Sequence, residues 1–151
     1  MNTKNHMHLS FDAKSINEGF ARMAVMGFMM DMNPTMDQLT DVKTAVSEAV
    51  TNAIVHGYSS EDEQVELSCE RDGQKLRIIV QDYGVGMEDV EKAREPFFTT
   101  KADMERSGMG FSFMEAFMDS LEVYSAPGEG TKVVMTKYID EQDISEEGAC
   151  E

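Results

Sequence analysis

Cysteine and long apolar runs are both scarce in this sequence. Its two cysteines, Cys69 and Cys150, lack the paired spacing of a metal or redox site, so we expect inert thiols suited to a reducing compartment. No apolar run approaches the length of a membrane span, and the first ten residues, MNTKNHMHLS, contain no apolar signal segment. These absences predict a cytoplasmic protein that does not enter a membrane.

Basic residues are also few. Lysine and arginine together number 13 against 29 acidic residues, which gives a formal net charge of -16. Direct nucleic-acid binding is therefore disfavoured, because neutralising phosphates needs clustered Lys and Arg side chains. A basic protein partner, or a nucleotide held through Mg²⁺, fits this charge better. The alternative is that the acidity only keeps the protein soluble.

The C-terminal end differs in composition from the rest of the chain. Residues 139–151, IDEQDISEEGACE, contain six acidic residues and no basic one, and this composition predicts a disordered tail. The preceding residues, 1–138, have the length of one domain with a sizeable core.

Hydrophobic periodicity predicts the elements of the first half. Alternating apolar residues predict a strand over residues 6–13, and apolar residues at helical spacing predict a helix from near Ser15 to Asp31. Asn33-Pro34 breaks this helix. Its apolar positions are Phe20, Met23, Ala24, Gly27, Phe28 and Met30. A second helix ends at Gly57 and carries a core stripe of Val42, Ala45, Val46, Ala49, Val50, Ala53 and Ile54.

The second half reads as two hairpins around a loop and a helix. Strands are predicted at 64–70 and 75–83 around RDGQ, and at 121–126 and 131–139 around PGEG. Between them we expect a short helix at 87–95, a loop at 95–107 and a helix at 108–119. The order predicts an α/β (α+β) two-layer sandwich, whose mixed, mostly antiparallel sheet is covered on one face by three longer helices. Most of the 14 methionines are expected in the core, although methionine also suits an adaptable contact surface.

Two polar residues lie together on the second helix. Glu48 and Asn52 are one turn apart, on the border of the apolar stripe. An amide oxygen combined with substrate phosphates can hold Mg²⁺, and a nearby carboxylate can accept a hydroxyl proton. The alternative is a solvated helix flank.

Glycine motifs mark three further candidate sites. In DYGVG, Asp82 ends a strand and can accept a hydrogen bond from an exocyclic amine, while Gly84 and Gly86 allow positive φ and close ligand approach. In RSGMGF, backbone N–H groups that begin a helix can bind phosphate, with Arg106 adding charge. In GEGT, Thr131 can support a base-binding residue. Each motif has a plainer alternative: a turn, an N-cap by Ser107 and a hairpin turn, respectively.

Taken together and in this order, the motifs resemble the GHKL superfamily of ATPases, which includes gyrase-type and histidine-kinase ATP-binding domains. Within it, the segments NEGFAR, PTMDQLTDVKTAVSEAVTNAIVHGY and FFTTKADMERSGMGF are similar to small bacterial anti-sigma factors that are also serine kinases. The residues of the second and third of these segments favour the sporulation type of anti-sigma factor over the general-stress type. The resemblance runs from about His6 to Tyr138.

The resemblance implies roles for individual residues. Asn52 would ligate Mg²⁺, Glu48 would be the general base, and Asp82 would bind the adenine amine of ATP. Residues 95–107 would form a lid over the nucleotide. The remaining implied nucleotide-binding residues are Gly84, Gly86, Thr99, Thr100, Lys101, Arg106, Ser107, Gly108, Met109, Gly110 and Thr131.

The resemblance also implies two activities. The protein would be a serine/threonine kinase that phosphorylates a serine of an anti-anti-sigma factor, and a homodimer that binds and inhibits a sporulation sigma factor. Arg22 matches a position used in partner contact; from the residues alone, a solvated helix charge is an equal alternative. A general-stress anti-sigma kinase and a non-catalytic module switched by ATP remain as alternatives. A histidine kinase would need a phosphorylated His in a dimerisation helix, and His6, His8 and His56 have no such context.

Overall fold

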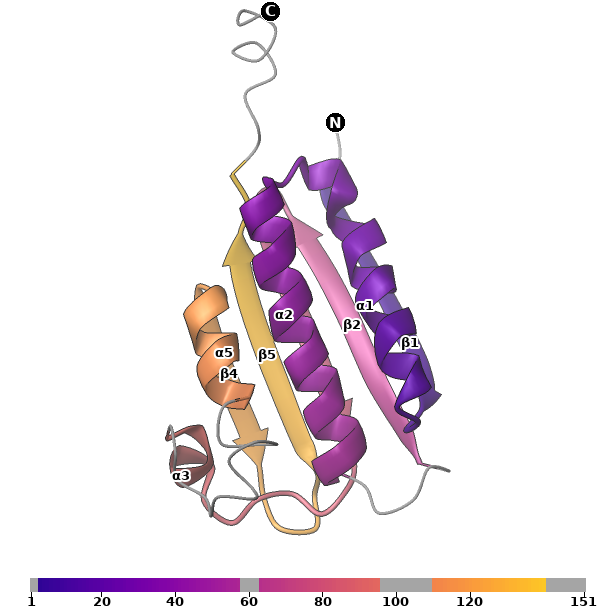
Figure 1. Cartoon of the computed structure of the whole chain (residues 1–151), viewed down its shortest axis with the longest axis vertical. Coiled ribbons are helices and arrows are strands. Elements are labelled where there is room, and N and C mark those ends of the chain that lie inside the picture. Colours follow the sequence, from indigo (N-terminus) through magenta and orange to yellow (C-terminus); the bar gives the residue numbers. More distant parts are fainter. Residues whose placement is uncertain (1–2, 58–62, 96–109, 141–151) are drawn as a thin grey trace, which may run out of the picture.

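Five antiparallel strands form the sheet in a computed structural model that describes residues 3–57, 63–95 and 110–140. The strands are β1 (Lys4–Asp12), β2 (Gln64–Asp72), β3 (Lys75–Asp82), β4 (Ser120–Ser125) and β5 (Thr131–Tyr138). They lie in the order β1-β2-β3-β5-β4, and each pairing is antiparallel (Figure 1). Both predicted hairpins, β2–β3 and β4–β5, are confirmed, with Gly73 at positive φ in the first turn.

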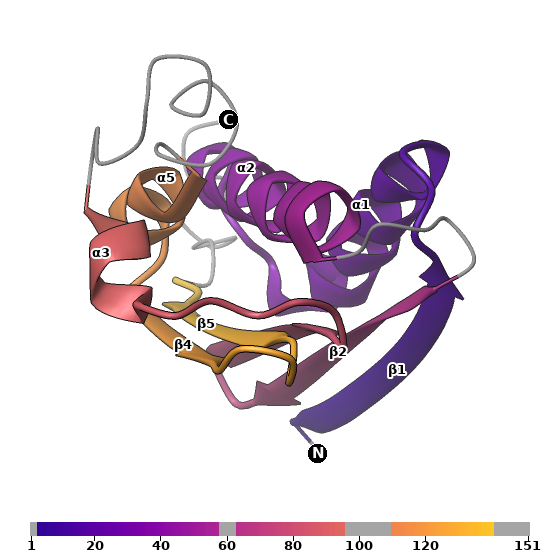
Figure 2. The same cartoon turned by 90° about the horizontal axis from the view of Figure 1, so that it is seen from below.

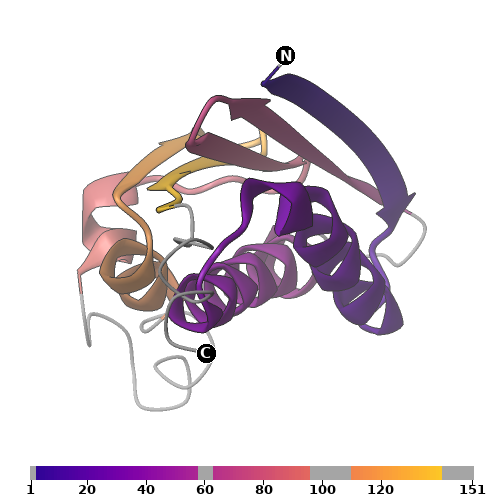
Figure 3. The same ribbon diagram turned by 90° about the horizontal axis from the view of Figure 1, so that it is seen from above.

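Helices cover one face of this sheet, as Figures 2 and 3 show from opposite ends. They are α1 (Ile16–Met29), α2 (Met36–Asn52) and α5 (Gly110–Phe117), while the short α3 (Val90–Arg94) lies beyond the β4 edge. A 3₁₀ turn, Met30–Met32, extends α1, and Asn33 then takes a left-handed conformation with φ 56°. The predicted two-layer sandwich is therefore confirmed.

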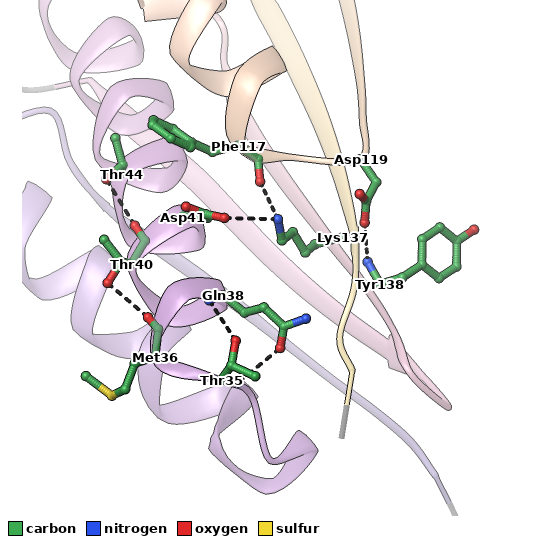
Figure 4. Close-up of polar contacts among 10 residues, drawn as sticks. All are labelled: Thr35, Met36, Gln38, Thr40, Asp41, Thr44, Phe117, Asp119, Lys137 and Tyr138. Carbon is green, nitrogen blue, oxygen red and sulfur yellow. Dashed lines mark hydrogen bonds and ion pairs between the residues drawn. The ribbon is translucent and has the colours of Figure 1, made fainter. Parts of the chain in front are cut away.

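Helix α2 is the centre of the helical layer. A capping box starts it: Thr35 Oγ1 accepts from the Gln38 N–H at 3.1 Å, and Gln38 Oε1 accepts from the Thr35 N–H at 3.0 Å (Figure 4). Its predicted core stripe is confirmed, because Val42, Ala45, Val46, Ala49 and Val50 are all buried against the sheet. These buried residues pack α2 against the sheet along most of its length, so the last turn of the helix has a fixed position.

The face of α1 that packs inward differs from the predicted apolar positions. Ala21, Val25 and Met29 are fully buried, whereas Phe20 and Met23 are 62% and 66% exposed. Both faces of this helix are apolar, and the face with the smaller side chains fits against α2 and the sheet. Of the methionines, Met29, Met32, Met114, Met118 and Met135 are buried, and Met23, Met30 and Met36 are exposed.

Two further features concern the ends of the fold. Ile139 is buried, and its N–H donates to the Gln74 carbonyl at 2.8 Å, so packing continues one residue past the predicted domain boundary after Tyr138. Residues 141–151 lie outside the described residues, and the disordered tail stays a prediction. Across the described ranges, every helix is too short or too polar to span a lipid bilayer.

Candidate functional site

A cavity of about 260 Å³ opens where the last turn of α2 meets the ends of β3 and β5. An apolar cavity of about 150 Å³ is enough to admit a benzene molecule, so this one has room for a two-ring base. Its walls are mostly apolar, as ligand pockets usually are. They are formed by Ala49, Asn52, Ala53, His56, Gly57, Val80, Asp82, Gly86, Met87, Ala93, Phe111, Thr131 and Val133.

Asp82 places a carboxylate in the wall of this cavity. It ends β3, is only 4% exposed, and lies opposite Thr131 in the β3–β5 register. Burial raises the pKa of Asp82 above its ordinary value, and backbone hydrogen bonds from Gly84 and Thr131 oppose that shift. The Gly84 N–H donates to Asp82 Oδ1 at 3.0 Å. The sheet therefore fixes a buried acceptor at the predicted strand end, where it faces an apolar hollow; the adenine contact of Asp82 stays a prediction.

Close backbone packing holds Asp82 in place. After Asn52 the helix continues as a π-helical turn, Ala53–Gly57, a feature often found at functional sites. This turn brings Gly57 against Asp82, where a Cβ on Gly57 would lie 2.5 Å from the carboxyl carbon. The Gly57 carbonyl accepts from the Val85 N–H at 2.9 Å. The predicted end of the helix at Gly57 is correct, but the π turn was not predicted.

The two glycines of DYGVG serve different purposes. Gly86 has φ +70°, as predicted, and it lines the cavity. Gly84 does not have a positive φ, so that part of the prediction is wrong. It is needed because a Cβ there would lie 1.5 Å from the Gly57 carbonyl oxygen, where no side chain can fit. Gly84 thus packs backbone on backbone instead of lining the cavity.

Thr131 belongs to a small polar network beside Asp82. Its Oγ1 lies 2.9 Å from Ser125 Oγ, which also donates to the Gly130 carbonyl at 2.8 Å and accepts from the Met87 N–H at 2.9 Å. The network joins the β4–β5 turn to the segment after β3. The Thr131 hydroxyl contacts Ser125, and Thr131 reaches Asp82 through its backbone N–H, so the support predicted from the Thr131 hydroxyl stays a prediction.

Asn52 presents a buried amide at the α5 side of the cavity. Neither its Oδ1 nor its Nδ2 has a hydrogen-bond partner among the described residues, although both atoms are shielded from solvent. An unpartnered buried polar group is costly, so this amide is suited to a ligand. Gly110, the first residue of α5, packs so closely that a Cβ on it would lie 2.9 Å from Asn52 Nδ2.

The Asn52 amide fits Mg²⁺ better than an ion that needs a full cage of protein ligands. In the parts of the chain that the structure describes, no group of three or more His, Cys, Asp or Glu residues can hold a metal. Mg²⁺ keeps several waters and is commonly held by one or two protein oxygens together with substrate phosphates. A lone buried amide oxygen is compatible with that type of binding.

Glu48 lies one turn before Asn52, outside the cavity wall. Its Oε2 would be 3.5 Å from a Cβ on Gly110, so it faces the start of α5. Burial raises the pKa of Glu48, and the negative charge of Glu18 on α1 raises it further. A carboxylate whose pKa moves toward neutrality is a better proton acceptor, so Glu48 can act as a general base here.

Seven predicted nucleotide-binding residues, and most of the predicted lid, lie outside the described residues: Thr99, Thr100, Lys101, Arg106, Ser107, Gly108 and Met109. The cavity also uses residues that the sequence did not single out, chiefly His56, Gly57, Met87 and Phe111. Gly57 had a signal, because it follows the Asn52 helix, but it was taken only as a helix terminator. His56 and Met87 had no assigned role, and Phe111 closes the RSGMGF motif but was not assigned to the nucleotide.

Arg22 lies away from the cavity, in a second hollow between α1 and α2. Its Nη1 is 3.5 Å from Glu18 Oε1, and its side chain is 33% exposed. The hollow is lined by Ser15, Glu18, Gly19, Arg22, Thr51, Ile54 and Val55. Glu18 Oε2 is buried without a partner among the described residues. The partner contact predicted for Arg22 stays a prediction.

Known proteins are similar to this chain over most of its length. Residues 11–137 match the family described as histidine kinase-like ATPase domain. The anti-sigma F factor of Clostridium perfringens (strain SM101 / Type A) is 54% identical over 137 residues, which cover 88% of this chain and 96% of that protein. The anti-sigma F factor of Oceanobacillus iheyensis is 52% identical over 137 residues, covering 90% of this chain and 94% of that protein.

A solved structure supports the fold alone. The RsbU and RsbW domains of Rv1364c from Mycobacterium tuberculosis superpose with a TM-score of 0.64 at 18% identity, covering 89% of this chain and 32% of that one. The family matches confirm the resemblance that the motifs indicated. The chain therefore belongs to the histidine kinase-like ATPase domain family and, within it, to the anti-sigma F factors.

Proposed function

We propose that this protein binds and inhibits a sporulation sigma factor, of the sigma-F type, and uses Mg-ATP to phosphorylate a serine of the opposing anti-anti-sigma factor. The observation that carries the proposal is a cavity with room for a purine, closed on one side by the buried Asp82 carboxylate and bordered by the unpartnered Asn52 amide. These two groups match the two ends of ATP, its base and its phosphates.

The adenine would enter the apolar part of the cavity. Its exocyclic amine would donate to Asp82, whose carboxylate is already oriented by the Gly84 N–H. Thr131, opposite Asp82 in the sheet, would support the same edge of the base. The ring faces would contact apolar side chains such as Val80 and Val133, which line the cavity. This arrangement supports binding of a purine that carries an amine.

The phosphates would lie toward Asn52 and the start of α5. Asn52 Oδ1 would hold Mg²⁺ together with phosphate oxygens and water. Bound there, the ion would offset negative charge on the phosphates during transfer. Backbone N–H groups near Gly110 would face the same phosphates because Gly110 contacts Asn52 so closely.

Glu48 would accept the proton of the attacking serine hydroxyl. Its position next to Gly110 places it beside the expected phosphates, outside the base pocket. Arg106, Gly108 and the other lid residues would contact the phosphates from a segment outside the described residues. Phosphoryl transfer depends mainly on such positioning and charge stabilisation.

Helix α1 would supply the protein-binding surface. Besides Arg22, it exposes the large apolar side chains of Ile16, Phe20 and Met23, and exposed apolar patches often mark interaction sites. We propose that this surface serves sigma-factor binding and the homodimer. The strong negative charge of the chain would favour basic partner surfaces.

One experiment tests the enzymatic part. The purified protein is mixed with Mg-ATP and either the sporulation or the general-stress anti-anti-sigma factor, and phosphoserine is measured by mass spectrometry. We expect phosphoserine on the sporulation antagonist and little on the other. Preference for the other antagonist would identify a general-stress kinase. ATP binding without any phosphoserine would instead identify a non-catalytic module switched by ATP.

An Arg22→Glu variant should bind the sigma factor at least about tenfold more weakly, because interface arginines are frequently hot spots and the change places two acids at positions 18 and 22. Affinity is measured by titration of the purified sigma factor in the presence of Mg-ATP. Lys43→Glu, an equal charge change at an exposed position of α2, serves as the control. Equal affinity of both variants would remove Arg22 from the interface.

A further inference from the structure

A largely shielded lysine joins three elements at the end of the molecule opposite the cavity. Lys137 extends from β5, and its side chain is only 12% exposed. Its Nζ donates to the Phe117 carbonyl at the last residue of α5, at 2.6 Å, and lies 3.4 Å from Asp41 Oδ2 on α2 (Figure 4). One ammonium group therefore contacts α5 and α2 from β5.

These contacts suit the chemistry of each partner. The last carbonyls of a helix have no intrahelical donor and carry partial negative charge, so a cation is stabilising there. A lysine that loses most of its water needs such partners, because an unpaired buried charge is very costly. Asp41 and the Phe117 carbonyl together satisfy that need, which fixes the end of α5 at one place.

A second residue anchors the exit from α5 to the same strand. The Asp119 N–H donates to the Thr136 carbonyl at 2.9 Å. Asp119 Oδ2 accepts from the Tyr138 N–H at 2.7 Å (Figure 4). These bonds lie on either side of Lys137 along β5. The C-terminal end of α5 is thus held by backbone and side-chain bonds together.

The opposite end of α5 faces the functional residues. The helix has eight residues, about 12 Å at 1.5 Å per residue, and it begins at Gly110 against Asn52 and Glu48. A rod this short transmits a shift at one end directly to the other. We propose that Lys137 is a positioning residue: its bonds to Phe117 and Asp41 set the position of α5 along α2, and so the spacing between Gly110 and Asn52.

The inference rests on the proposed function, because the spacing matters only if phosphates bind there. A Lys137→Met variant, which removes the ammonium and keeps a long side chain, should bind Mg-ATP about tenfold more weakly. Its affinity for adenosine should fall much less, because most of the described cavity lining belongs to the sheet, the end of α2 and the turn after it, and α5 contributes Phe111 to it. Both dissociation constants are measured by titration at a temperature where the variant is fully folded. For adenosine, NMR detects binding during the titration.

The split between the two ligands separates positioning from general stability. The inference would be overturned if Lys137→Met lost equal affinity for adenosine and for Mg-ATP, or if neither affinity changed. Lys75→Met, at an exposed position of β3 whose Cα pairs with Tyr138, is the matched control and should bind both ligands normally. If Lys137→Met does not fold, Asp41→Ala decides by the same split, because it removes one of the two bonds of the ammonium and leaves the bond to Phe117. Failure of the unaltered protein to bind Mg-ATP would instead overturn the proposed function itself.

Discussion

A Glu48→Gln variant should transfer phosphate to the anti-anti-sigma serine about 10²–10⁴-fold more slowly than the unaltered protein, the range that a positioned general base contributes. Its affinity for Mg-ATP should be largely unchanged. Glutamine has the same shape as glutamate but cannot accept the proton, and Glu48 lies outside the wall of the cavity. Initial rates of phosphoserine formation and equilibrium titration of Mg-ATP measure the two quantities.

The same variant should remain as stable as the unaltered protein. The pKa of Glu48 is raised in the folded state by burial and by Glu18, so the folded chain binds this proton more tightly than the unfolded chain. The ionised carboxylate therefore lowers the free energy of unfolding; this cost is absent below the unfolded pKa and grows as the pH rises from there through the folded pKa. A neutral glutamine removes the cost. Thermal unfolding at neutral pH checks this, with Glu129→Gln in the exposed β4–β5 turn as control.

The raised pKa also predicts a pH dependence. A base works only when deprotonated, so the rate should fall with decreasing pH at a higher pH than for an ordinary glutamate. Replacing Glu18 with glutamine removes a negative charge beside Glu48, which should move this acidic limb to lower pH. Glu48 would be excluded as the base if Glu48→Gln transferred phosphate at an unchanged rate. It would also be excluded if the acidic limb of the rate profile lay at the same pH with and without Glu18.

Much of the fold follows from local patterns. The core stripe of α2 follows from a hydrophobic period of 3.6 residues, and the strands of both hairpins follow from a period of 2 residues. Both periods can be recognised within a short stretch of the sequence. Helix α1 shows the limit of this approach. With apolar residues on both faces, its inward face was decided by contact with α2 and the sheet, where Ala21 and Val25 fit and Phe20 does not.

The candidate site shows the same division. Glu48 and Asn52 could be singled out because they lie one turn apart on the border of an apolar stripe, and Asp82 because it ends a strand, while their roles stay predictions. The role of Gly57 could not be predicted, since it depends on a contact with Gly84 and Asp82 about 25 positions later in the chain. Lys137 carries no motif at all, and only the packing of α5 and α2 beside β5 gives it partners.

An Asp82→Asn variant should bind ATP about 10- to 100-fold more weakly. Both an incoming adenine amine and the backbone N–H groups of Gly84 and Thr131 require acceptors at this side chain. Asparagine has one acceptor oxygen and one donor group, so at least one donor is left facing another donor. A buried donor or acceptor left unpaired costs about 1–3 kcal/mol, and each 1.4 kcal/mol is tenfold in affinity.

Comparison with inosine triphosphate, which has an oxygen in place of the amine, tests the reason for that loss. The unaltered protein should prefer ATP clearly, and Asp82→Asn should lose most of this preference, because the two changes act on one hydrogen bond. Asp72→Asn, an equal change at the exposed end of β2, should keep both the affinity and the preference. An Asp82→Asn variant that still prefers ATP as strongly as the unaltered protein would show that the adenine amine binds elsewhere, and the base would then have no assigned place in the cavity.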